Sequence, residues 1–214
     1  MNLVIAIDGP AAAGKGTLAR RLAEHYGLAY LDSGSLYRGT ALSLLRQGLT
    51  APDDAAAVAA AKALRPELLG DPELRAERTG ALASKVAVIP AVRAALLEWQ
   101  RGFAAHPPAG KRGTVLDGRD IGTVVLPDAM VKFFITATDE ARAERRFKEL
   151  QGRSEGAIYP RVLEDMRERD ARDTARSTAP MRPAEDAVII DTSALDAEQV
   201  FRRAIEYIEQ RSRN

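Results

Sequence analysis

The feature that most constrains the fold of this chain is a glycine-rich segment placed between a strand pattern and a helix pattern. Residues 2–8 form an apolar, β-branched run, and from residue 16 onward leucines recur at helical spacing until Gly27. The residues between these patterns are Gly9, Pro10, Ala11, Ala12, Ala13, Gly14, Lys15, Gly16 and Thr17. In such a setting glycines let the backbone wrap a polyphosphate, the N–H groups of a helix N-terminus point at it, and a lysine neutralises its charge. We interpret the segment as a phosphate-binding loop; the alternative is an ordinary glycine-rich turn between a strand and a helix.

Strand patterns and helix patterns alternate along the rest of the chain. Strand character returns at residues 28–31, 113–117, 130–135 and 187–191, and helical spacing at residues 35–47, 138–152, 159–176 and 197–210. This alternation predicts an α/β fold with a mostly parallel sheet flanked by helices. With the phosphate-binding loop after its first strand, such a fold is of the P-loop NTPase type. Residues 50–110 are alanine-rich and predict two or three short helices, the last over residues 91–104. We expect residues 1–214 to form a single domain.

Composition excludes several classes of protein. The chain carries 31 basic and 30 acidic side chains, and a net charge of +1 provides no broad basic field for nucleic acid. It has no cysteine, which excludes disulfides and thiolate metal sites, and its two histidines, His25 and His106, belong to none of the motifs. No apolar run reaches the length of about 18 residues that a membrane span needs, and the N-terminal run is too short for a signal sequence. We therefore expect a cytoplasmic protein without a nucleic-acid or membrane partner.

Two positions bear on metal binding. In the common phosphate loop a Ser or Thr directly follows the lysine, whereas here Gly16 separates Lys15 from Thr17. Asp117 ends the strand pattern at residues 113–117, as the acidic residue of a Walker B strand does. We expect no metal held directly by protein side chains. Mg²⁺ would enter with the nucleotide, and Thr17, Asp117 and water are the candidates to contact it.

Polar residues follow two of the predicted strands, at the edge where open α/β sheets bind ligands. Residues 31–38 read Leu-Asp-Ser-Gly-Ser-Leu-Tyr-Arg, which also suits a turn and a helix cap. Residues 116–123 read Leu-Asp-Gly-Arg-Asp-Ile-Gly-Thr, for which a surface turn held by an Arg–Asp pair is the alternative. Both segments are candidates for a second substrate site.

Arginines are concentrated in residues 142–182, which hold ten of them. Arg169, Asp173 and Arg176 are spaced i, i+4 and i+7, which would place them on one face of a helix. For any single arginine a solvated helix face is the simpler interpretation. As a group near a phosphate loop, they indicate a lid over about residues 150–176 that closes over transferring phosphates.

Taken together, these residues resemble the bacterial cytidylate kinase family. The motifs that carry the resemblance run in the family's order along nearly the whole chain, at residues 9–17, 32–38, 89–93, 117–123, 168–173 and 179–180. The resemblance implies a P-loop kinase with a short lid and a helical insertion, at residues 50–84, that binds the nucleoside monophosphate. Longer members of the family carry a small β-rich insertion there, where this chain has only residues 64–79.

The resemblance also implies which residues contact the substrates. All nine residues of the phosphate loop would bind ATP. The contacts to CMP would be Arg38, Arg119 and Arg176 to its phosphate, Ser33, Ser84, Arg93 and Asp120 at or near its base, and Arg169 and Asp173 to its pentose, with Asp32 in the same set. The catalytic charges would be those of Lys15, Arg119, Arg172 and Arg176.

The reaction implied is the transfer of phosphate from Mg-ATP to CMP or dCMP by a monomeric enzyme. A phosphate monoester has a second pKa near 6, so the acceptor is already a dianion at neutral pH and needs no catalytic base. Catalysis would consist of positioning and charge neutralisation. We expect the insertion and the lid to move on binding, because water must be excluded.

Two alternatives remain open. The chain could be another small-molecule kinase, with UMP or AMP as the acceptor, or a regulatory P-loop NTPase. The GTPase strings Asn-Lys-x-Asp and Asp-x-x-Gly do not occur, and the pair Asp139 and Glu140 opens a helix pattern instead of closing a core strand.

Overall fold

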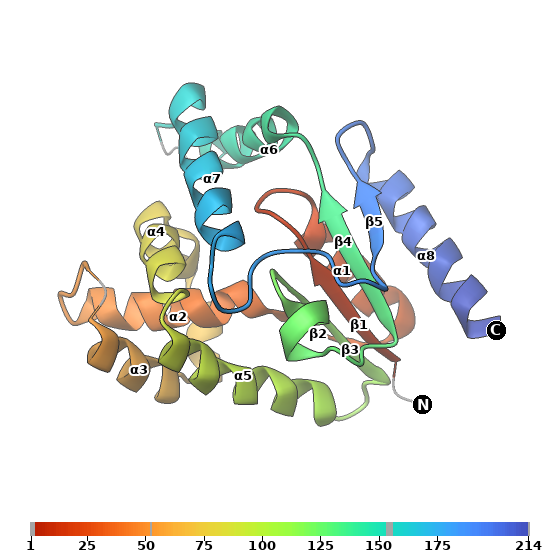
Figure 1. The fold of residues 1–214 in the computed structure, drawn as a ribbon, viewed down its shortest axis with the longest axis horizontal. Coiled ribbons are helices and arrows are strands. Elements are labelled where there is room, and N and C mark those ends of the chain that lie inside the picture. Colours follow the sequence, from red (N-terminus) through yellow and green to blue (C-terminus); the bar gives the residue numbers. More distant parts are fainter. Residues whose placement is uncertain (1–2, 52, 153–155, 214) are drawn as a thin grey trace. The chain divides into compact units, whose positions relative to one another are not determined.

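A five-stranded parallel sheet organises the larger part of the molecule (Figure 1), which a computed structural model describes for residues 3–51, 53–152 and 156–213. The strands are β1 (Leu3–Asp8), β2 (Ala29–Asp32), β3 (Gly113–Gly118), β4 (Val131–Thr136) and β5 (Val188–Asp191), in the order β2-β3-β1-β4-β5. The predicted α/β class is therefore confirmed. The predicted strands lie within two residues of the observed ones, except that Asn2 lies outside the described residues.

The register of the central strand aligns the carboxyl ends of its neighbours. β1 pairs in parallel with β3 and β4, so that Asp8 lies opposite Gly118 on one side and Phe134 on the other. The loop that follows β1 therefore begins beside the segment that follows β3. This is the edge of a parallel sheet at which ligands bind.

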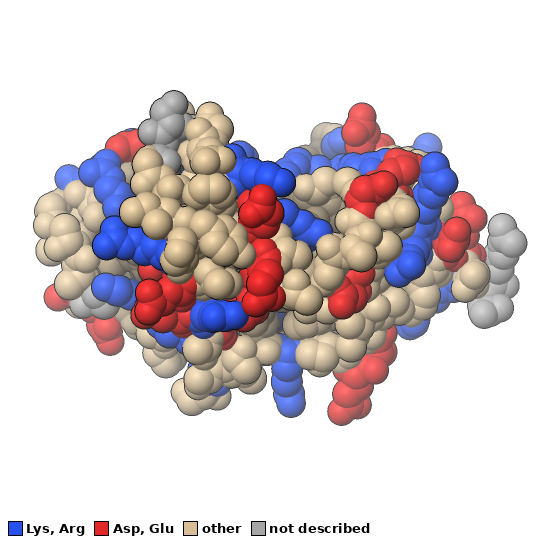
Figure 2. All heavy atoms as spheres, turned by 90° about the horizontal axis from the view of Figure 1, so that it is seen from above, with Lys and Arg blue, Asp and Glu red and all other residues tan. Residues whose placement is uncertain are grey.

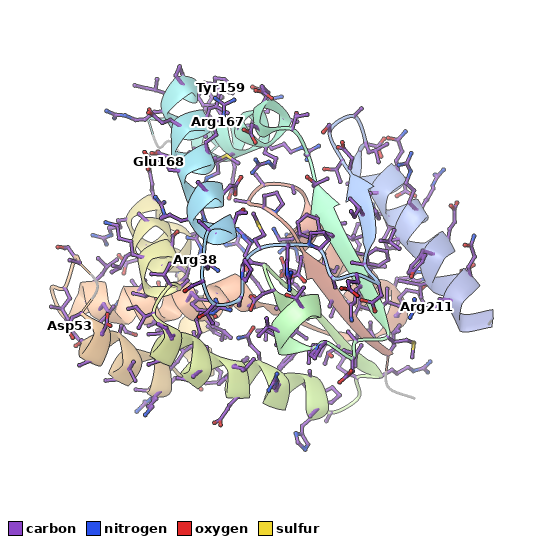
Figure 3. The ribbon with its side chains drawn as sticks, in the orientation of Figure 1. Arg38, Asp53, Tyr159, Arg167, Glu168 and Arg211 are labelled. Atoms are coloured by element: carbon purple, nitrogen blue, oxygen red, sulfur yellow. The ribbon has the colours of Figure 1, made fainter. Side chains whose placement is uncertain are left out.

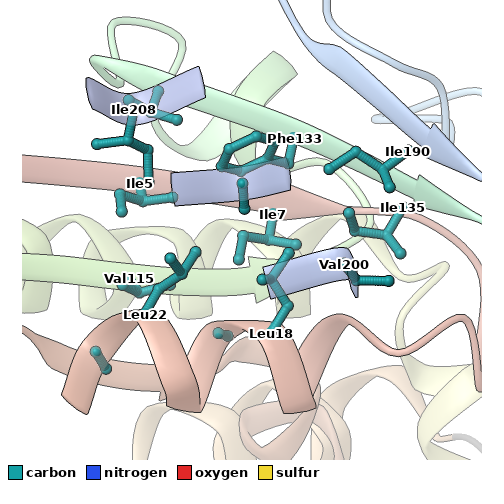
Figure 4. Close-up of a cluster of buried hydrophobic side chains, with 14 of the residues drawn as sticks. Ile5, Ile7, Leu18, Leu22, Val115, Phe133, Ile135, Ile190, Val200 and Ile208 are labelled. Carbon is teal, nitrogen blue, oxygen red and sulfur yellow. The ribbon is translucent and has the colours of Figure 1, made fainter. Parts of the chain in front are cut away.

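One face of the sheet is covered by α1 (Lys15–Tyr26) and α8 (Ala197–Arg213). Successive side chains of a strand point to opposite faces, and Ile5 and Ile7 of β1 both point to this one. They pack in a buried cluster with Leu18 of α1, Phe133 of β4 and Ile208 of α8 (Figure 4). The cluster anchors α1, whose N-terminus carries the phosphate loop.

Two charged helices, α6 (Asp139–Gln151) and α7 (Tyr159–Thr174), pack against each other. Thr138 caps α6, its hydroxyl accepting a hydrogen bond from the Ala141 N–H at 3.3 Å. Their small core consists of Ala143, Leu150, Val162 and Met166, and the loop residues Ala11 and Ala12 pack against it. The lid predicted over residues 150–176 thus includes α7, while its residues 153–155 lie outside the described residues.

The second compact unit spans Asp32–His106 and is helical. Its helices are α2 (Ser33–Arg46), α3 (Asp54–Lys62), α4 (Glu77–Val86) and α5 (Pro90–Ala105), with 3₁₀ turns at Pro66–Gly70 and Pro72–Arg75. Three helices after residue 50 agree with the prediction. The described residues of 50–84 contain no strand, in line with the shortened insertion.

Acidic and basic side chains are interspersed over the face shown in Figure 2, and no single sign of charge dominates it. Some charged side chains pair within one helix, as Arg202 does with Glu198 in α8. In the part of the chain that the structure describes, no single helix is long and apolar enough to cross a membrane. Helices α4 and α5 pass this test only as a pair bent by 102°.

Candidate active site

The phosphate loop adopts a backbone that requires glycine where it leaves the sheet. Gly9 has a φ of 137°, and a Cβ at this position would lie 1.9 Å from the carbonyl oxygen of Ile135 in β4. At the other end, Gly14 has a φ of 99° and caps α1. Between them Ala12 is held at a φ of 56°, a strained conformation of the kind that gathers at functional sites. The surrounding structure therefore fixes the backbone conformation of the loop, which differs from that of an ordinary turn.

Lys15 is the first residue of α1, and its side chain folds back over the loop. Its Nζ donates a hydrogen bond to the Pro10 carbonyl at 2.6 Å, and the residue is only 6% exposed. The ammonium group and the positive end of the helix dipole thus lie together at the loop. Thr17, one turn into α1, is exposed.

Asp117 and Tyr30 lie next to this helix. The Tyr30 hydroxyl donates a hydrogen bond to Asp117 at 2.9 Å, so the expected Walker-B-like carboxylate has a partner of its own. The same hydroxyl lies 3.4 Å from the place that a Cβ at Gly16 would occupy. A serine or threonine at position 16, as in the common motif, would crowd this pair.

The segment after β3 is buried, which makes its interpretation as a surface turn wrong. Asp120 is 6% exposed and begins a π-helical turn over Ile121–Val125, a structure that the sequence pattern did not reveal. The Asp120 side chain makes no capping hydrogen bond to this turn. π-Helical turns are rare and are frequently found at functional sites.

Arg119, Asp173 and Arg176 form a buried ion cluster. Arg119 Nε donates to Asp173 Oδ2 at 2.9 Å, and Arg176 Nη2 donates to Asp173 Oδ1. Burial alone would raise the pKa of Asp173, but the charges of the two arginines outweigh it and hold this pKa below its usual range. The structure therefore joins two of the phosphate candidates, Arg119 and Arg176, through a pentose candidate, Asp173.

Helical spacing did not place Arg176 correctly. Helix α7 ends at Thr174, so Arg176 lies beyond it and reaches Asp173 from the following bend. Arg169, on the helix, adds its charge near Asp173. Arg172 lies on the exposed side of α7, where it pairs with Glu168 at 3.5 Å; Figure 3 labels Glu168.

The candidates of the second unit lie on α2, α4 and α5. Asp32 is exposed, and Ser33 is buried at the start of α2. Arg38, labelled in Figure 3, donates to the Leu74 carbonyl at 2.7 Å. Its guanidinium group lies so close to α4 that a Cβ at Gly80 would come within 2.9 Å of it.

Ser84 and Arg93, the other two candidates in that unit, are both buried. The Arg93 guanidinium lies 5.8 Å from the centre of the Tyr37 ring, and its Nη1 donates to the Ala87 carbonyl at 3.4 Å. Ser33 and Arg38 thus lie on α2, and Arg93 lies on α5.

Among the described residues no group of three or more His, Cys, Asp or Glu side chains could hold a metal ion. His25 and His106 are exposed, and His25 packs edge-on against Phe201. The two histidines are therefore surface residues, and His25 also packs against a neighbouring ring.

Comparison with known proteins adds the deciding observation. The family model for cytidylate kinase matches residues 5–210 of this chain. The chain belongs to the cytidylate kinase family. The cytidylate kinase of Paramagnetospirillum magneticum is 60% identical over 205 residues, covering 96% of this chain and 97% of the relative. That of a Methylobacterium species is 61% identical over 209 residues, covering 98% of each chain.

Solved structures with little sequence identity share the fold of this cytidylate kinase family member. A gluconokinase from Sinorhizobium meliloti superposes with a TM-score of 0.52 at 14% identity, covering 98% of this chain and 93% of its own. An uncharacterized protein from Eubacterium ventriosum gives a TM-score of 0.54 at 15% identity, covering 97% and 98%. At these identities the likeness concerns the fold alone.

The sequence did not predict the roles of two buried charged residues of this cytidylate kinase family member, Arg142 and Asp8. Arg142 is 3% exposed and donates to the Ala11 carbonyl of the loop at 3.3 Å, to Asp170 of α7 at 2.5 Å and to Asp139 at 2.5 Å. It therefore fastens α6 and α7 to the phosphate loop. The second is Asp8, whose two oxygens accept hydrogen bonds from the N–H groups of Ile121 and Gly122. Asp8 could have been singled out from the sequence, because it is the one ionisable residue in a strand that is otherwise apolar.

Proposed function

We propose that this chain catalyses phosphoryl transfer from ATP to CMP or dCMP, giving ADP and CDP or dCDP. The match of the cytidylate kinase family model across residues 5–210 carries the proposal. Relatives with that name, 60% and 61% identical over nearly the whole chain, support it. These comparisons do not favour a UMP or AMP kinase, or a regulatory NTPase.

The donor nucleotide would bind at residues 9–17. Backbone N–H groups of the loop and of the first turn of α1 offer hydrogen bonds to phosphate oxygens, and the helix dipole favours their charge. Lys15 would exchange its bond to the Pro10 carbonyl for the β- and γ-phosphates. Charge neutralisation at these oxygens is the main contribution a protein can make to phosphoryl transfer.

Magnesium would accompany ATP. The donor set fits an ion held mainly by phosphates and water, because the described residues offer no cluster of three ligands while the Thr17 hydroxyl and the Asp117 carboxylate lie by the loop. Thr17 and Asp117 are the residues that would contact its water shell. When bound, Mg²⁺ offsets the charge of the β- and γ-phosphates.

The acceptor phosphate would be held by Arg38, Arg119 and Arg176, because a guanidinium group binds phosphate oxygens in a bidentate manner. As a dianion at neutral pH, the acceptor attacks without a catalytic base. Arg172 of α7 would supply further positive charge when the lid closes.

The nucleoside would be recognised by two further groups of residues. Asp120 would accept from the exocyclic amino group of cytosine, for which carboxylates are the suited partners. Asp32, Ser33, Ser84 and Arg93 would line the neighbourhood of the base, and Arg169 with Asp173 would contact the pentose. We propose that residues 50–84 form the monophosphate-binding insertion, that residues 150–176 form the lid, and that the enzyme acts as a monomer.

A coupled assay for ADP production tests the proposal with CMP, dCMP, UMP, AMP and GMP as acceptors. We expect turnover with CMP and dCMP to exceed that with the other three by at least about tenfold. ADP production that no monophosphate stimulates would refute the kinase assignment.

The Lys15→Met variant provides the control for the assay. Removing transition-state charge stabilisation of a few kcal/mol should lower kcat by about a hundredfold or more while the melting curve stays near that of the parent. A folded variant with near-normal kcat would contradict the assignment of the phosphate loop.

A further inference from the structure

Asp8 has no part in the reaction described above, although it is among the most buried charged groups of the chain. It is the last residue of β1 and only 3% exposed. Its Oδ1 accepts from the Ile121 N–H at 2.7 Å and its Oδ2 from the Gly122 N–H at 2.7 Å. Both oxygens of the carboxylate are therefore engaged by one short stretch of backbone.

The position of these partners makes Asp8 a link between two loops. Through its own peptide bond Asp8 leads into Gly9, the first residue of the phosphate loop. The N–H groups that it accepts from belong to the π-helical turn that directly follows Arg119 and Asp120. One side chain thus joins the loop that would hold ATP to the segment that would hold the acceptor.

The surroundings leave little room for this link to shift. A Cβ at Gly9 would strike the Ile135 carbonyl at 1.9 Å, which fixes the backbone next to Asp8 against β4. A Cβ at Gly122 would lie 3.4 Å from Asp8 Oδ2 and 3.2 Å from the side chain of Lys132. The Asp8 carboxylate is therefore in close contact with the π-helical turn, and the Lys132 side chain packs against the same turn.

The charge of Asp8 also lies among the charges of the site. Burial and the charge of Asp120 raise the pKa of Asp8, whereas its two N–H bonds and the charge of Lys15 lower it. Holding an anion in such a place costs more than holding a neutral asparagine or serine. A neutral side chain, however, offers only one acceptor oxygen and cannot satisfy both N–H groups.

We propose that Asp8 is a positioning residue for phosphoryl transfer, holding the phosphate loop and the Arg119–Asp120 segment in one register. This inference rests on the proposed function, because that function places the two substrates on these two segments. The attacking and departing oxygens must lie in line with the transferring phosphorus, and a misplacement of about 1 Å can lower a rate by about a hundredfold. Asp8 touches neither substrate, so its loss should act on kcat more than on KM.

The test is the Asp8→Asn variant, in which one N–H group loses its acceptor and faces an amide N–H instead. With kcat expressed per folded enzyme, we expect it to fall about 10- to 100-fold, while KM for ATP and for CMP changes by less than about threefold. A matched control is Ile208→Ala, which removes a buried side chain of the α8 core far along the chain. We expect the control to lower the melting temperature and to keep kcat within about twofold.

A second variant changes the other partner of the same contact, Gly122, whose N–H donates to Asp8. Gly122→Ala would place a Cβ 3.4 Å from Asp8 Oδ2 and 3.2 Å from the Lys132 side chain, and we expect this crowding at the contact to lower kcat in the same direction. Because both changes break one link, the double variant should be no slower than Asp8→Asn alone by more than about twofold. A kcat within twofold of the parent in Asp8→Asn would overturn the proposal, and so would strictly multiplicative effects in the double variant.

These outcomes are separable from failure of the proposed function. If the parent chain does not phosphorylate CMP, the function itself is wrong. If the parent is active and Asp8→Asn is equally active, only the positioning role is wrong.

Discussion

Replacing Asp8 by asparagine removes a buried carboxylate whose pKa burial raises from 3.8 to about 6. In the unfolded chain the same group titrates near its ordinary value of about 3.9. The folded protein therefore binds this proton more tightly than the unfolded chain does, over the window from about pH 4 to pH 6. Wherever the folded state binds more protons, its stability falls as pH rises.

The size of the effect follows from the shift. Each pKa unit corresponds to about 1.4 kcal/mol, so a shift of about two units is worth about 3 kcal/mol, most of which falls between pH 4 and pH 7. The parent chain carries this pH-dependent loss and Asp8→Asn does not. We expect the stability of the variant relative to the parent to rise by about 2 to 3 kcal/mol between pH 4 and pH 7.

Urea unfolding of both proteins across this range, followed by circular dichroism, measures the difference directly. Groups shared by the two chains cancel in the comparison, including Asp173 and Asp139, whose pKa values are lowered. A difference that is independent of pH, or that falls as pH rises, would refute the reasoning. It would mean that the two N–H bonds and Lys15 outweigh burial at Asp8.

Three further predictions concern the site. Arg119→Ala should lower kcat/KM for CMP by about a hundredfold, whereas Arg202→Ala, on the exposed side of α8, should leave it unchanged; equal small effects in steady-state assays would mean that the acceptor site is misplaced. Asp120→Asn should lower kcat/KM for CMP by about ten- to a thousandfold, or roughly 1.4 to 4 kcal/mol, and affect UMP much less; a parallel fall for both acceptors would contradict a role in reading the base. Gly9→Ala should destabilise the fold by at least about 3 kcal/mol, because its Cβ would overlap the carbonyl oxygen of Ile135; a melting temperature within a few degrees of the parent's would exclude the described loop geometry.

Local patterns were enough to predict the parts of the molecule that local physics determines. The phosphate loop was recognisable because strand, glycines, lysine and helix follow one another directly in sequence. The same holds for the short helices after residue 50, where propensity and spacing act within a few residues.

Features that depend on distant contacts were not predictable in this way. Asp8 meets Ile121 across 113 residues of sequence, and Arg142 meets Ala11 across 131. The position of Arg176 was mistaken because helical spacing presumes that the helix continues, and α7 ends two residues earlier. The first N–H groups of the π-helical turn after Asp120 donate to Asp8, a contact that no pattern within residues 120–125 encodes.

In the structure, Asp173 is the counter-ion of both Arg119 and Arg176. The carboxylate is 1% exposed, and dissolved salt screens such a pair very little. An inorganic phosphate ion that approaches these two arginines must therefore displace a carboxylate that belongs to the chain itself. A nucleotide would meet the same competition, but the binding of its base and pentose would contribute as well. With Arg119 and Arg176 holding the acceptor phosphate as we propose, the ion cluster would favour phosphate carried by a nucleoside over abundant small anions.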